Sequence, residues 1–326
     1  MNPASERVRA AVAAALPPGY GAITHWVGPR QGDWSWMFEV ETGGVGPASL
    51  LVKVPRWDDA NDLLLALEQG PQAATEEEYR ALETIAAAVA SSGDPGLTAV
   101  VPVTYARAVN AVVTERLRAV TLHHWLRRRG RVETADLFGR VGRWLRVFHA
   151  TSTQEVKPFG TAEAAEIEQL GGPGGSRRLG DAISAVAGAA QNLATRPVAT
   201  GVLHGDFSMR NVLVTIDDRV AVVDPNRHRG RITRDVAHLL TEVRLGRRQL
   251  VTSGAFRKRS TVEGWADSVT AGYPEIDSAL LSYERAAAAV KRWADVEARM
   301  KGISRVTLLP AGRLFRSEVD ALLRTI

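Results

Sequence analysis

The sequence contains no cysteine, which excludes disulfide bonds, thiol nucleophiles and zinc sites built from thiolates. It also lacks any apolar run approaching the roughly 20 residues that a membrane-spanning helix needs. Its first twenty residues do not have the layout of a signal peptide, because charged residues interrupt the apolar ones. They predict a short amphipathic helix that ends at Pro17 and Pro18. We therefore expect a cytoplasmic protein without a membrane span.

A basic stripe interleaved with aromatic residues is also missing, so we expect no binding of nucleic acid. The net charge is +5, and arginines far outnumber lysines. Two explanations remain open for this surplus: arginines on solvated surfaces, or attraction for anionic ligands such as nucleotide phosphates. The 326 residues are enough for one or two domains. The sequence leaves the oligomeric state open.

What the sequence does contain is a strand-rich first third followed by a mostly helical remainder. Apolar residues at helical spacing predict helices at 76–90 and 134–150. Short or alternating apolar runs, bounded by turn residues, predict strands at 33–40, 49–54, 99–103, 111–115, 211–215 and 219–223. This order predicts an α+β fold with two unequal lobes and a cleft between them. We place the N-lobe at residues 1–116 and the C-lobe at residues 117–326.

Three polar residues stand at strand ends around one predicted hairpin. Asp206 follows a strand, Asn211 comes five residues later, and Asp224 comes thirteen residues after that. Such residues can converge although the chain between them is apolar. Phosphoryl transfer needs this kind of group: one carboxylate accepts the acceptor's proton, while an amide oxygen and a second carboxylate hold Mg²⁺. The alternative is a turn whose side chains satisfy their own backbone.

The string HGDFSMRN followed by VVDPN resembles the aminoglycoside phosphotransferase and choline kinase superfamily, a branch of the protein-kinase-like fold. The resemblance covers roughly residues 20–245. It implies an ATP-dependent phosphotransferase with an alcohol group as acceptor, in which Asp206 is the catalytic base and Asn211 and Asp224 bind Mg²⁺. His204 would brace the catalytic loop. Asp235 matches a family aspartate that opens a helix under this loop, and we expect it to cap or brace backbone N–H groups.

A kinase-like fold also needs a strand lysine that contacts the nucleotide phosphates and a helix glutamate that holds it. Lys53 lies in the middle of an apolar strand, where a charge is costly without a partner. On the helix at 76–90, Glu78 falls at the centre of the apolar face that Leu82, Ile85 and Val89 define. We therefore predict a buried Lys53–Glu78 pair. The alternative is two unrelated exposed charges.

Two further segments resemble nucleotide-binding parts of the family. The segment from Val112 to Leu117, which includes Glu115, resembles the linker whose backbone meets the adenine; it can also be an ordinary edge strand. Between the first two strand candidates, backbone N–H groups from Gly32 to Ser35 could cradle phosphates. A plain hairpin turn explains this second segment equally well.

Three positions separate the chain from other kinases. Ser208 stands where protein kinases carry a lysine, and only ten residues lie between Asp224 and Asp235, too few for a protein-kinase activation segment. Ser208 and this short stretch favour a small-molecule kinase over an atypical protein kinase. One feature departs from the pattern of small-molecule members: Asp224 is followed by Pro225, which restricts its backbone, and by Asn226, whose contribution to the metal or the acceptor stays open. A non-catalytic nucleotide-binding module is disfavoured because all five positions that the resemblance expects are filled.

The acceptor is inferred from charge. A polycationic aminoglycoside would need clustered carboxylates, whereas the C-terminal half is rich in arginine. These arginines are Arg244, Arg247, Arg248, Arg257 and Arg259. A neutral or anionic hydroxyl compound, such as a sugar or glycoconjugate, is the expected acceptor. An aminoglycoside or another antibiotic stays open because acidic residues are interspersed, and so does the choice between ATP and GTP.

Overall fold

The computed structural model describes residues 2–32, 34–56, 62–68, 70, 72–128, 133–160, 162–170, 176–246, 257–299 and 305–326. Contacts divide the chain into two compact units. Unit 1 consists of Met1–Ala119 and Thr215–Asp224, and unit 2 of Val120–Val214 and Pro225–Ile326. The lobe boundary that we place after residue 116 stays a prediction.

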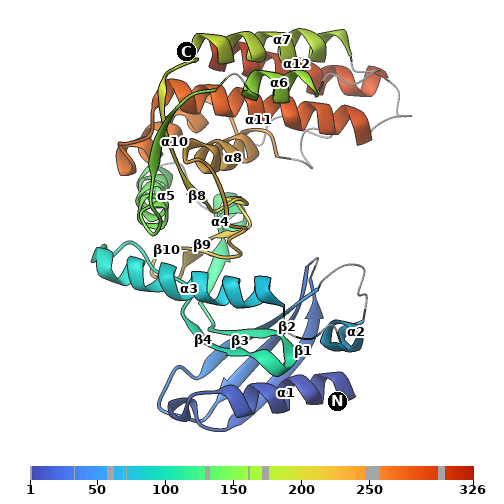
Figure 1. Cartoon of the computed structure of the whole chain (residues 1–326), viewed down its shortest axis with the longest axis vertical. Helices are drawn as coiled ribbons and strands as arrows, with labels where there is room; N and C mark the ends of the chain where they lie inside the picture. The colour runs from blue at the N-terminus through green and yellow to red at the C-terminus, as the bar shows by residue number, and fades with distance from the viewer. Residues whose placement is uncertain are drawn as a thin grey trace. The chain divides into compact units, whose positions relative to one another are not determined.

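The core of unit 1 is a five-stranded antiparallel sheet with the order β1-β2-β3-β5-β4. Its strands are β1 (Ile23–Gln31), β2 (Ser35–Thr42), β3 (Ser49–Pro55), β4 (Pro102–Ala106) and β5 (Ala111–Glu115). Side chains alternate across β2 and β3, so that Phe38 and Val52 are fully buried on one face. Helices α1 (Pro3–Ala15) and α2 (Leu63–Glu68) contribute to the same apolar cluster. The other face carries α3 (Ala73–Ser92) (Figure 1).

The strand that we place at residues 99–103 lies three residues further along the chain in the structure, where β4 spans Pro102–Ala106. The physical reason is that the chain just before β4 is held by another segment. The N–H of Thr98 donates to the carbonyl of Val220 at 2.9 Å, and Leu97 forms an isolated β-bridge with Val220. The other strand and helix predictions in unit 1 agree with the structure to within three residues at each end.

Unit 2 is mainly helical. Its longer helices are α5 (Glu133–His149), α7 (Arg177–Asn192), α8 (Thr233–Arg244), α10 (Arg259–Gly272), α11 (Ser278–Arg299) and α12 (Arg305–Leu323), and its shorter ones are α4 (Leu122–Arg128) and α6 (Ala162–Glu168). Helices α7, α11 and α12 pack together around a core that includes Tyr283, Trp293 and Phe315 (Figure 1). Helix α5 packs against α10. Among the described residues, the structure has no helix that is both long and apolar enough to span a bilayer.

A three-stranded antiparallel sheet in unit 2 leads into the loop at residues 204–211. Its order is β11-β8-β7, with β7 at Glu155–Pro158, β8 at Pro197–Leu203 and β11 at His228–Arg231. Sequence patterns do not reveal β7 and β11, because both are short and largely polar. The short strands β6 (Ala119–Thr121), β9 (Val212–Thr215) and β10 (Val220–Val222) occur where the chain passes between the units.

Candidate catalytic site

The catalytic loop occupies residues 204–211 of unit 2, between β8 and β9. The side-chain amide of Asn211 donates to both the carbonyl and the carboxylate Oδ2 of Asp206, each at 2.9 Å. The N–H of Ser208 also donates to the Asp206 carbonyl at 2.9 Å. The Asp206 side chain is nevertheless 55% exposed. The loop therefore holds this carboxylate in place while leaving it accessible to a ligand.

Gly205 allows the turn between His204 and Asp206. Its φ is +83°, a conformation that side-chain-bearing residues rarely adopt. A Cβ at this position would lie 2.1 Å from the carbonyl oxygen of Asn226. The chain at Asn226 must come this close because its N–H donates to the His204 carbonyl at 2.7 Å. A glycine is required at the centre of the His-Gly-Asp motif for this reason.

Asp235 braces the catalytic loop from below. Its carboxylate accepts the backbone N–H groups of His204 at 2.7 Å and Gly205 at 3.1 Å, and Nε2 of His149 lies 3.0 Å away. Burial alone would raise the pKa of Asp235, but the hydrogen bond and charge of His149 and the contacts with His204 outweigh it and lower the pKa. The structure thus shows Asp235 bracing the loop backbone. His204 is buried between the rings of Phe148 and Phe207.

Sequence reasoning missed His149. This fully buried side chain joins Asp235 to the hydroxyl of Tyr273, which lies 3.2 Å from its Nδ1. Burial strongly raises the pKa of Tyr273. One signal was available in the sequence: His149 stands four residues after Leu145, on the apolar face of the predicted helix at 134–150.

Helix α8 contacts the catalytic loop at further points that sequence reasoning also missed. His238 places Nε2 3.9 Å from Oδ1 of Asp206, and Glu242 accepts the N–H of Met209 at 2.7 Å. With Asp235, these residues stand at positions i, i+3 and i+7 of α8 and share one face of the helix. The sequence shows this spacing, but it does not show that these three side chains face the loop at residues 204–211.

In unit 1 the structure brings Lys53 and Glu78 together, as we predict. Nζ of Lys53 lies 2.8 Å from Glu78 and 2.6 Å from Asp224. Burial alone would lower the pKa of Lys53, but the carboxylates of Glu78 and Asp224 outweigh it and raise the pKa. Lys53 and Glu78 are about one-fifth exposed, whereas Asp224 is 55% exposed. Two carboxylates therefore hold the lysine, and one of them faces solvent.

Asp224 adopts a strained backbone conformation. Its φ is +55°, which is uncommon for a residue with a side chain and costs on the order of 1–3 kcal/mol. Aspartate tolerates this region better than most residues. Backbone strain of this kind is concentrated at active sites and ligand-binding positions. The strain is an observation that points to function at Asp224, independent of the sequence motif.

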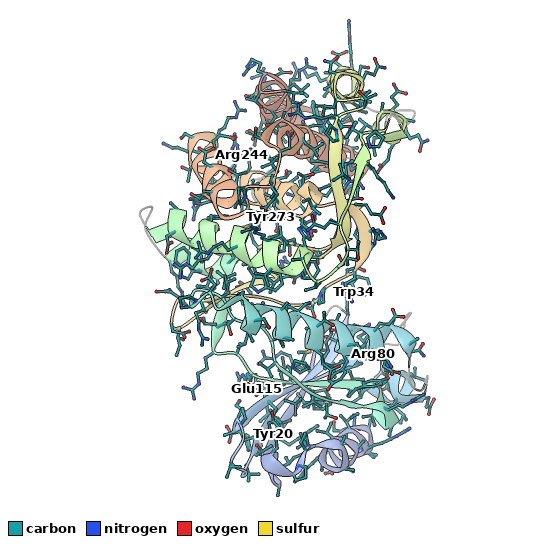
Figure 2. The ribbon with its side chains drawn as sticks, turned by 60° about the vertical axis from the view of Figure 1, so that its left-hand side comes forward. Tyr20, Trp34, Arg80, Glu115, Arg244 and Tyr273 are labelled. Carbon is teal, nitrogen blue, oxygen red and sulfur yellow. The ribbon has the colours of Figure 1, made fainter. Side chains whose placement is uncertain are left out.

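The remaining predicted nucleotide-binding residues lie in the unit 1 sheet or beside it. The Glu115 side chain accepts the hydroxyl of Tyr20 at 3.4 Å (Figure 2), and the N–H groups of Glu115 and Arg116 are used by Val101 and Ser49. Leu117 lies two residues after the end of β5. The N–H of Gly32 donates to the carbonyl of Ser35 at 2.7 Å, which is the bond of a hairpin turn. For Gly32, the structure favours the hairpin over a phosphate cradle.

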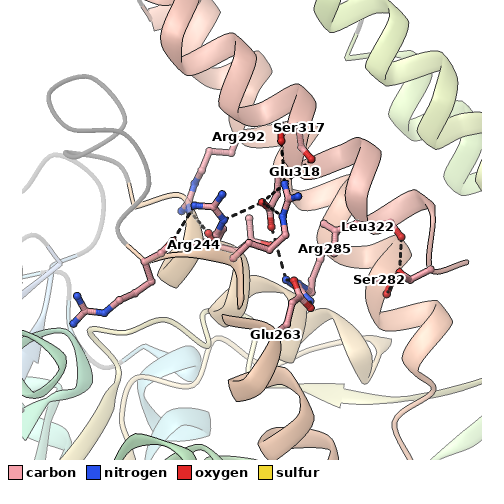
Figure 3. A network of polar contacts seen from close by, with 12 residues as sticks. Arg244, Glu263, Ser282, Arg285, Arg292, Ser317, Glu318 and Leu322 are labelled. Atoms are coloured by element: carbon pink, nitrogen blue, oxygen red, sulfur yellow. Dashed lines mark hydrogen bonds and ion pairs between the residues drawn. The ribbon is translucent and has the colours of Figure 1, made fainter. Parts of the chain in front are cut away.

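Three of the five arginines that suggested an anionic acceptor have internal partners. Arg244 donates to the buried Glu318 at 2.9 Å, and Arg259 donates to the same carboxylate at 3.0 Å (Figure 3). Arg257 donates to the carbonyl of Leu126. Arg247 and Arg248 lie outside the described residues. Arg244 and Arg259 therefore hold helices together, and their number in the sequence says little about the acceptor.

The donors proposed for a metal are oxygen atoms. Because the nitrogen of the Asn211 side chain is engaged by Asp206, its amide oxygen is the atom left to meet a cation. The amide oxygen of Asn211, in unit 2, and the carboxylate of Asp224, in unit 1, are each of the hard oxygen type that suits Mg²⁺. No cluster of three or more acidic, histidine or cysteine side chains suited to a metal occurs in the described ranges. By the chemistry of their donor atoms, these residues fit Mg²⁺.

Comparisons with known proteins identify the family and the fold. The model of the phosphotransferase enzyme family matches residues 27–267. The fold is similar to that of a choline/ethanolamine kinase family protein from Mesorhizobium loti, with a TM-score of 0.54, 15% identity and coverage of 99% of this chain and 98% of that chain. It is also similar to the amicoumacin kinase hAmiN, with a TM-score of 0.55, 14% identity and coverage of 98% and 94%. No curated protein matches the chain.

The choline kinase LicA from Streptococcus pneumoniae is a third similar structure, with a TM-score of 0.51, 13% identity and coverage of 93% of this chain and 94% of that chain. These likenesses confirm the predicted two-lobed kinase-like fold with a β-rich N-lobe and a helical C-lobe. The family match confirms the predicted phosphotransferase. It spans well over half of the sequence, from β1 to α10. The chain belongs to the phosphotransferase enzyme family.

Proposed function

We propose that the protein transfers the γ-phosphate of ATP to a hydroxyl group of a small molecule, with a sugar or glycoconjugate as the favoured acceptor. One observation carries the proposal: the half-exposed carboxylate of Asp206 is fixed by Asn211 on a loop that a buried aspartate braces from beneath. This arrangement suits a general base, because it combines a defined position with access to a ligand.

In the proposed reaction, Asp206 orients the acceptor hydroxyl and takes its proton. The hydroxyl oxygen forms a bond to the γ-phosphorus, and the bond from that phosphorus to the oxygen bridging it to the β-phosphate breaks, which releases ADP. His238, 3.9 Å from the Asp206 carboxylate, lies near enough to contact an acceptor that binds there. His204 and Asp235 keep the loop in shape and do not react.

Asn211 and Asp224 are the residues that we propose hold Mg²⁺. Chain connectivity supports their joint action, because only Pro225 separates Asp224 from Asn226, whose N–H bonds to the catalytic loop at His204. When bound, the ion would neutralise charge on the transferring phosphate. In this interpretation Asn226 serves through its backbone, as the link between the metal carboxylate and the loop.

Lys53 is the residue that we propose contacts the nucleotide phosphates. Glu78 holds it and keeps it charged, as the raised pKa of Lys53 indicates. Leu117 is the linker residue whose backbone we propose meets the adenine, because the N–H groups of Glu115 and Arg116 are already used. The N–H of Gly32 donates to the carbonyl of Ser35, so this N–H group could meet a phosphate only after that hydrogen bond opened.

The carboxylates of unit 2 support a neutral or anionic acceptor. Most acidic residues that could form a pocket for a polycation have partners. These residues and partners are Glu242 with Met209, Glu263 with Arg285, Glu275 with Arg146, Asp277 with Arg196, and Glu284 with Arg231. Near the loop, His123 has Arg127 and Arg210 as neighbours, and they contribute to the lowering of its pKa after burial.

The names of the similar structures do not decide the acceptor. One is a choline kinase and another an amicoumacin kinase, so one fold accepts chemically different hydroxyl compounds. An antibiotic-inactivating kinase is therefore the main alternative for this chain. Aminoglycosides are disfavoured by the paired carboxylates described above.

The proposal is tested by incubating the purified protein with Mg²⁺ and either ATP or GTP, together with a panel of sugars, choline-like alcohols and aminoglycosides. ADP or GDP release and the mass of the phosphorylated product are measured. The expected result is turnover with a sugar or glycoconjugate. Turnover with aminoglycosides alone would contradict the acceptor that we propose, while leaving the phosphotransferase chemistry intact.

A non-catalytic module and an atypical protein kinase predict different results in the same assay. A module would be stabilised by nucleotide against heat without turning over any acceptor. A protein kinase would phosphorylate its own serines, and this labelling would disappear in Asp206→Ala. Product formation on a small molecule, lost in that variant, supports the proposal over both.

A further inference from the structure

A cavity of about 310 Å³ lies on unit 2 between the neighbouring helices α7 and α12 (Figure 1). Its lining residues are Arg178, Arg313, Arg316, Ser317, Asp320 and Arg324. Four guanidinium groups and one carboxylate give this lining a formal charge of +3, from four positive charges less one negative. The cavity has no residue in common with the catalytic loop or with the Lys53 cluster.

The α12 side of the cavity follows from helical spacing. Arg313, Arg316 and Asp320 stand at positions i, i+3 and i+7, and Arg324 comes four residues later. The opposite side of α12 is apolar and buried, with Phe315 fully inaccessible. Packing of that apolar side therefore turns the arginine stripe outward, toward the end of α7 that carries Arg178.

A buried ion-pair network fixes this orientation. Glu318, on the inner side of α12, is 2% exposed and accepts hydrogen bonds from Arg244 and Arg259 (Figure 3). Arg259 also donates to the carbonyl and the hydroxyl of Ser317, which lines the cavity. The α12 wall of the cavity is thus held in place by residues of α8 and α10.

The charges within the cavity are not balanced. Asp320 is already paired with Arg316, at 2.9 Å. Arg178, Arg313 and Arg324 are exposed, and Asp320 is the one acidic residue in the lining as described. Guanidinium groups bind phosphate oxygens through paired hydrogen bonds, and like charges gathered around one space favour a multivalent anion. The volume is near the lower end of the range for small-molecule sites.

We propose that this cavity binds a free, soluble ligand with two or more phosphate groups. The ligand would bridge Arg178 on α7 with Arg313 and Arg324 of the α12 stripe. This inference does not rest on the proposed function, since it concerns a separate set of residues and is tested by binding.

The test is calorimetric titration of the full chain with inorganic pyrophosphate, compared with inorganic phosphate. Pyrophosphate should bind more tightly than phosphate. The double variant Arg313→Ala/Arg324→Ala should weaken pyrophosphate binding by about 100-fold, since each charge-assisted hydrogen bond is typically worth about tenfold or more. Arg177→Ala removes an exposed arginine next to Arg178 that does not line the cavity, and it should leave binding unchanged.

Two further variants locate the site and separate charge from folding. Lys53→Ala removes the lysine proposed for the nucleotide phosphates, so cavity binding should persist in it. Arg313→Lys/Arg324→Lys keeps the charges and should retain part of the affinity. Three outcomes would each overturn the proposal. One is that Arg177→Ala weakens pyrophosphate binding as much as the double variant Arg313→Ala/Arg324→Ala does. Another is that Lys53→Ala weakens this binding while the double variant does not, and the third is that the protein binds a single-stranded oligonucleotide but not pyrophosphate.

Discussion

Asp206 lies in the loop at residues 204–211 of unit 2, and Asp235 lies on α8, next to that loop. The surroundings of the two carboxylates nevertheless differ sharply. The Asp206 side chain is 55% exposed and has one side-chain donor, Asn211, at hydrogen-bond distance. The Asp235 side chain is 3% exposed and receives two backbone N–H groups as well as the ring of His149. A carboxylate that meets a ligand must keep access to it, whereas a buried carboxylate is stable only when several donors replace its water.

Unit 1 shows the same division on a smaller scale. Glu78 is largely covered and holds Lys53, while Asp224 keeps more than half of its side chain exposed. Among the carboxylates, exposure therefore separates those proposed to touch ligands from those that position other groups. Substitutions of the first kind should affect turnover with little effect on stability, and substitutions of the second kind should affect stability first.

Outside the loop at residues 204–211, the substitution Asp224→Asn is expected to lower turnover the most. Loss of the metal carboxylate should lower kcat/KM by on the order of 10²-fold or more, because a bound metal supplies several kcal/mol of charge stabilisation. Stability should change little, since asparagine also tolerates a positive φ. Steady-state kinetics and thermal unfolding check both parts.

Asp217→Asn is the matched control for this prediction. Asp217 is 51% exposed and lies in the same hairpin, between β9 and β10. The substitution should leave turnover within about twofold, as surface changes far from special features usually do. An equal loss in both variants would show that the hairpin as a whole, and not the Asp224 carboxylate, is sensitive.

Asp235→Ala is expected to destabilise the fold by about 3–5 kcal/mol, because it leaves buried donors without an acceptor. The measurement is the free energy of unfolding from denaturant titration. Asp267→Ala, at an exposed position of α10, is the control and should lie within about 0.5 kcal/mol of the parent protein. If Asp235→Ala were as stable as the control, the bracing role would be wrong.

Acid sensitivity should follow Asp235 as well. Its pKa is lowered in the folded state, so its stabilising contribution is present above the ordinary value of 3.8 and is lost as the pH falls through the lower folded value. Asp235→Asn cannot titrate. Between pH 5 and about pH 2, we therefore expect a shallower loss of stability in this variant than in the parent protein. Parallel pH profiles would contradict the assignment.

The smallest effect is expected for a salt bridge on the surface. Arg146 and Glu275 are about half exposed and lie 2.6 Å apart, so Arg146→Ala should lower the free energy of unfolding by less than about 1 kcal/mol. Arg244 is 9% exposed and paired with Glu318, so Arg244→Ala should lower the free energy of unfolding several times more. Denaturant titration of both variants measures the ratio. Equal costs would mean that burial does not separate the two pairs.

Local patterns allowed part of this site to be predicted. The family resemblance asked for a strand lysine held by a helix glutamate, and helical spacing then singled out Glu78, because a carboxylate at the centre of an apolar face needs a partner. Chain spacing grouped Asp206 with Asn211. The second pair lies within one loop, whereas Lys53 and Glu78 lie on different elements and needed the resemblance as well as the local pattern.

Other features depend on packing between distant segments and could not be predicted. His149 reaches Asp235 across 86 residues, and Arg244 reaches Glu318 across 74. The sequence shows these charges but not their partners, so Arg244 was assigned to ligand binding when it holds helices together. Strand β4 was misplaced for a similar reason, since the residues before it bond to Val220 far along the chain.

The central claim is that Asp206 is the base of a phosphotransferase, and single-turnover kinetics of Asp206→Asn test it most directly. Nucleotide affinity is measured on the same samples. The account predicts that phosphoryl transfer slows by about 10²–10⁴-fold while the Kd for ATP and the unfolding temperature stay close to those of the parent protein. Phosphoryl transfer at the parental rate in Asp206→Asn would contradict it.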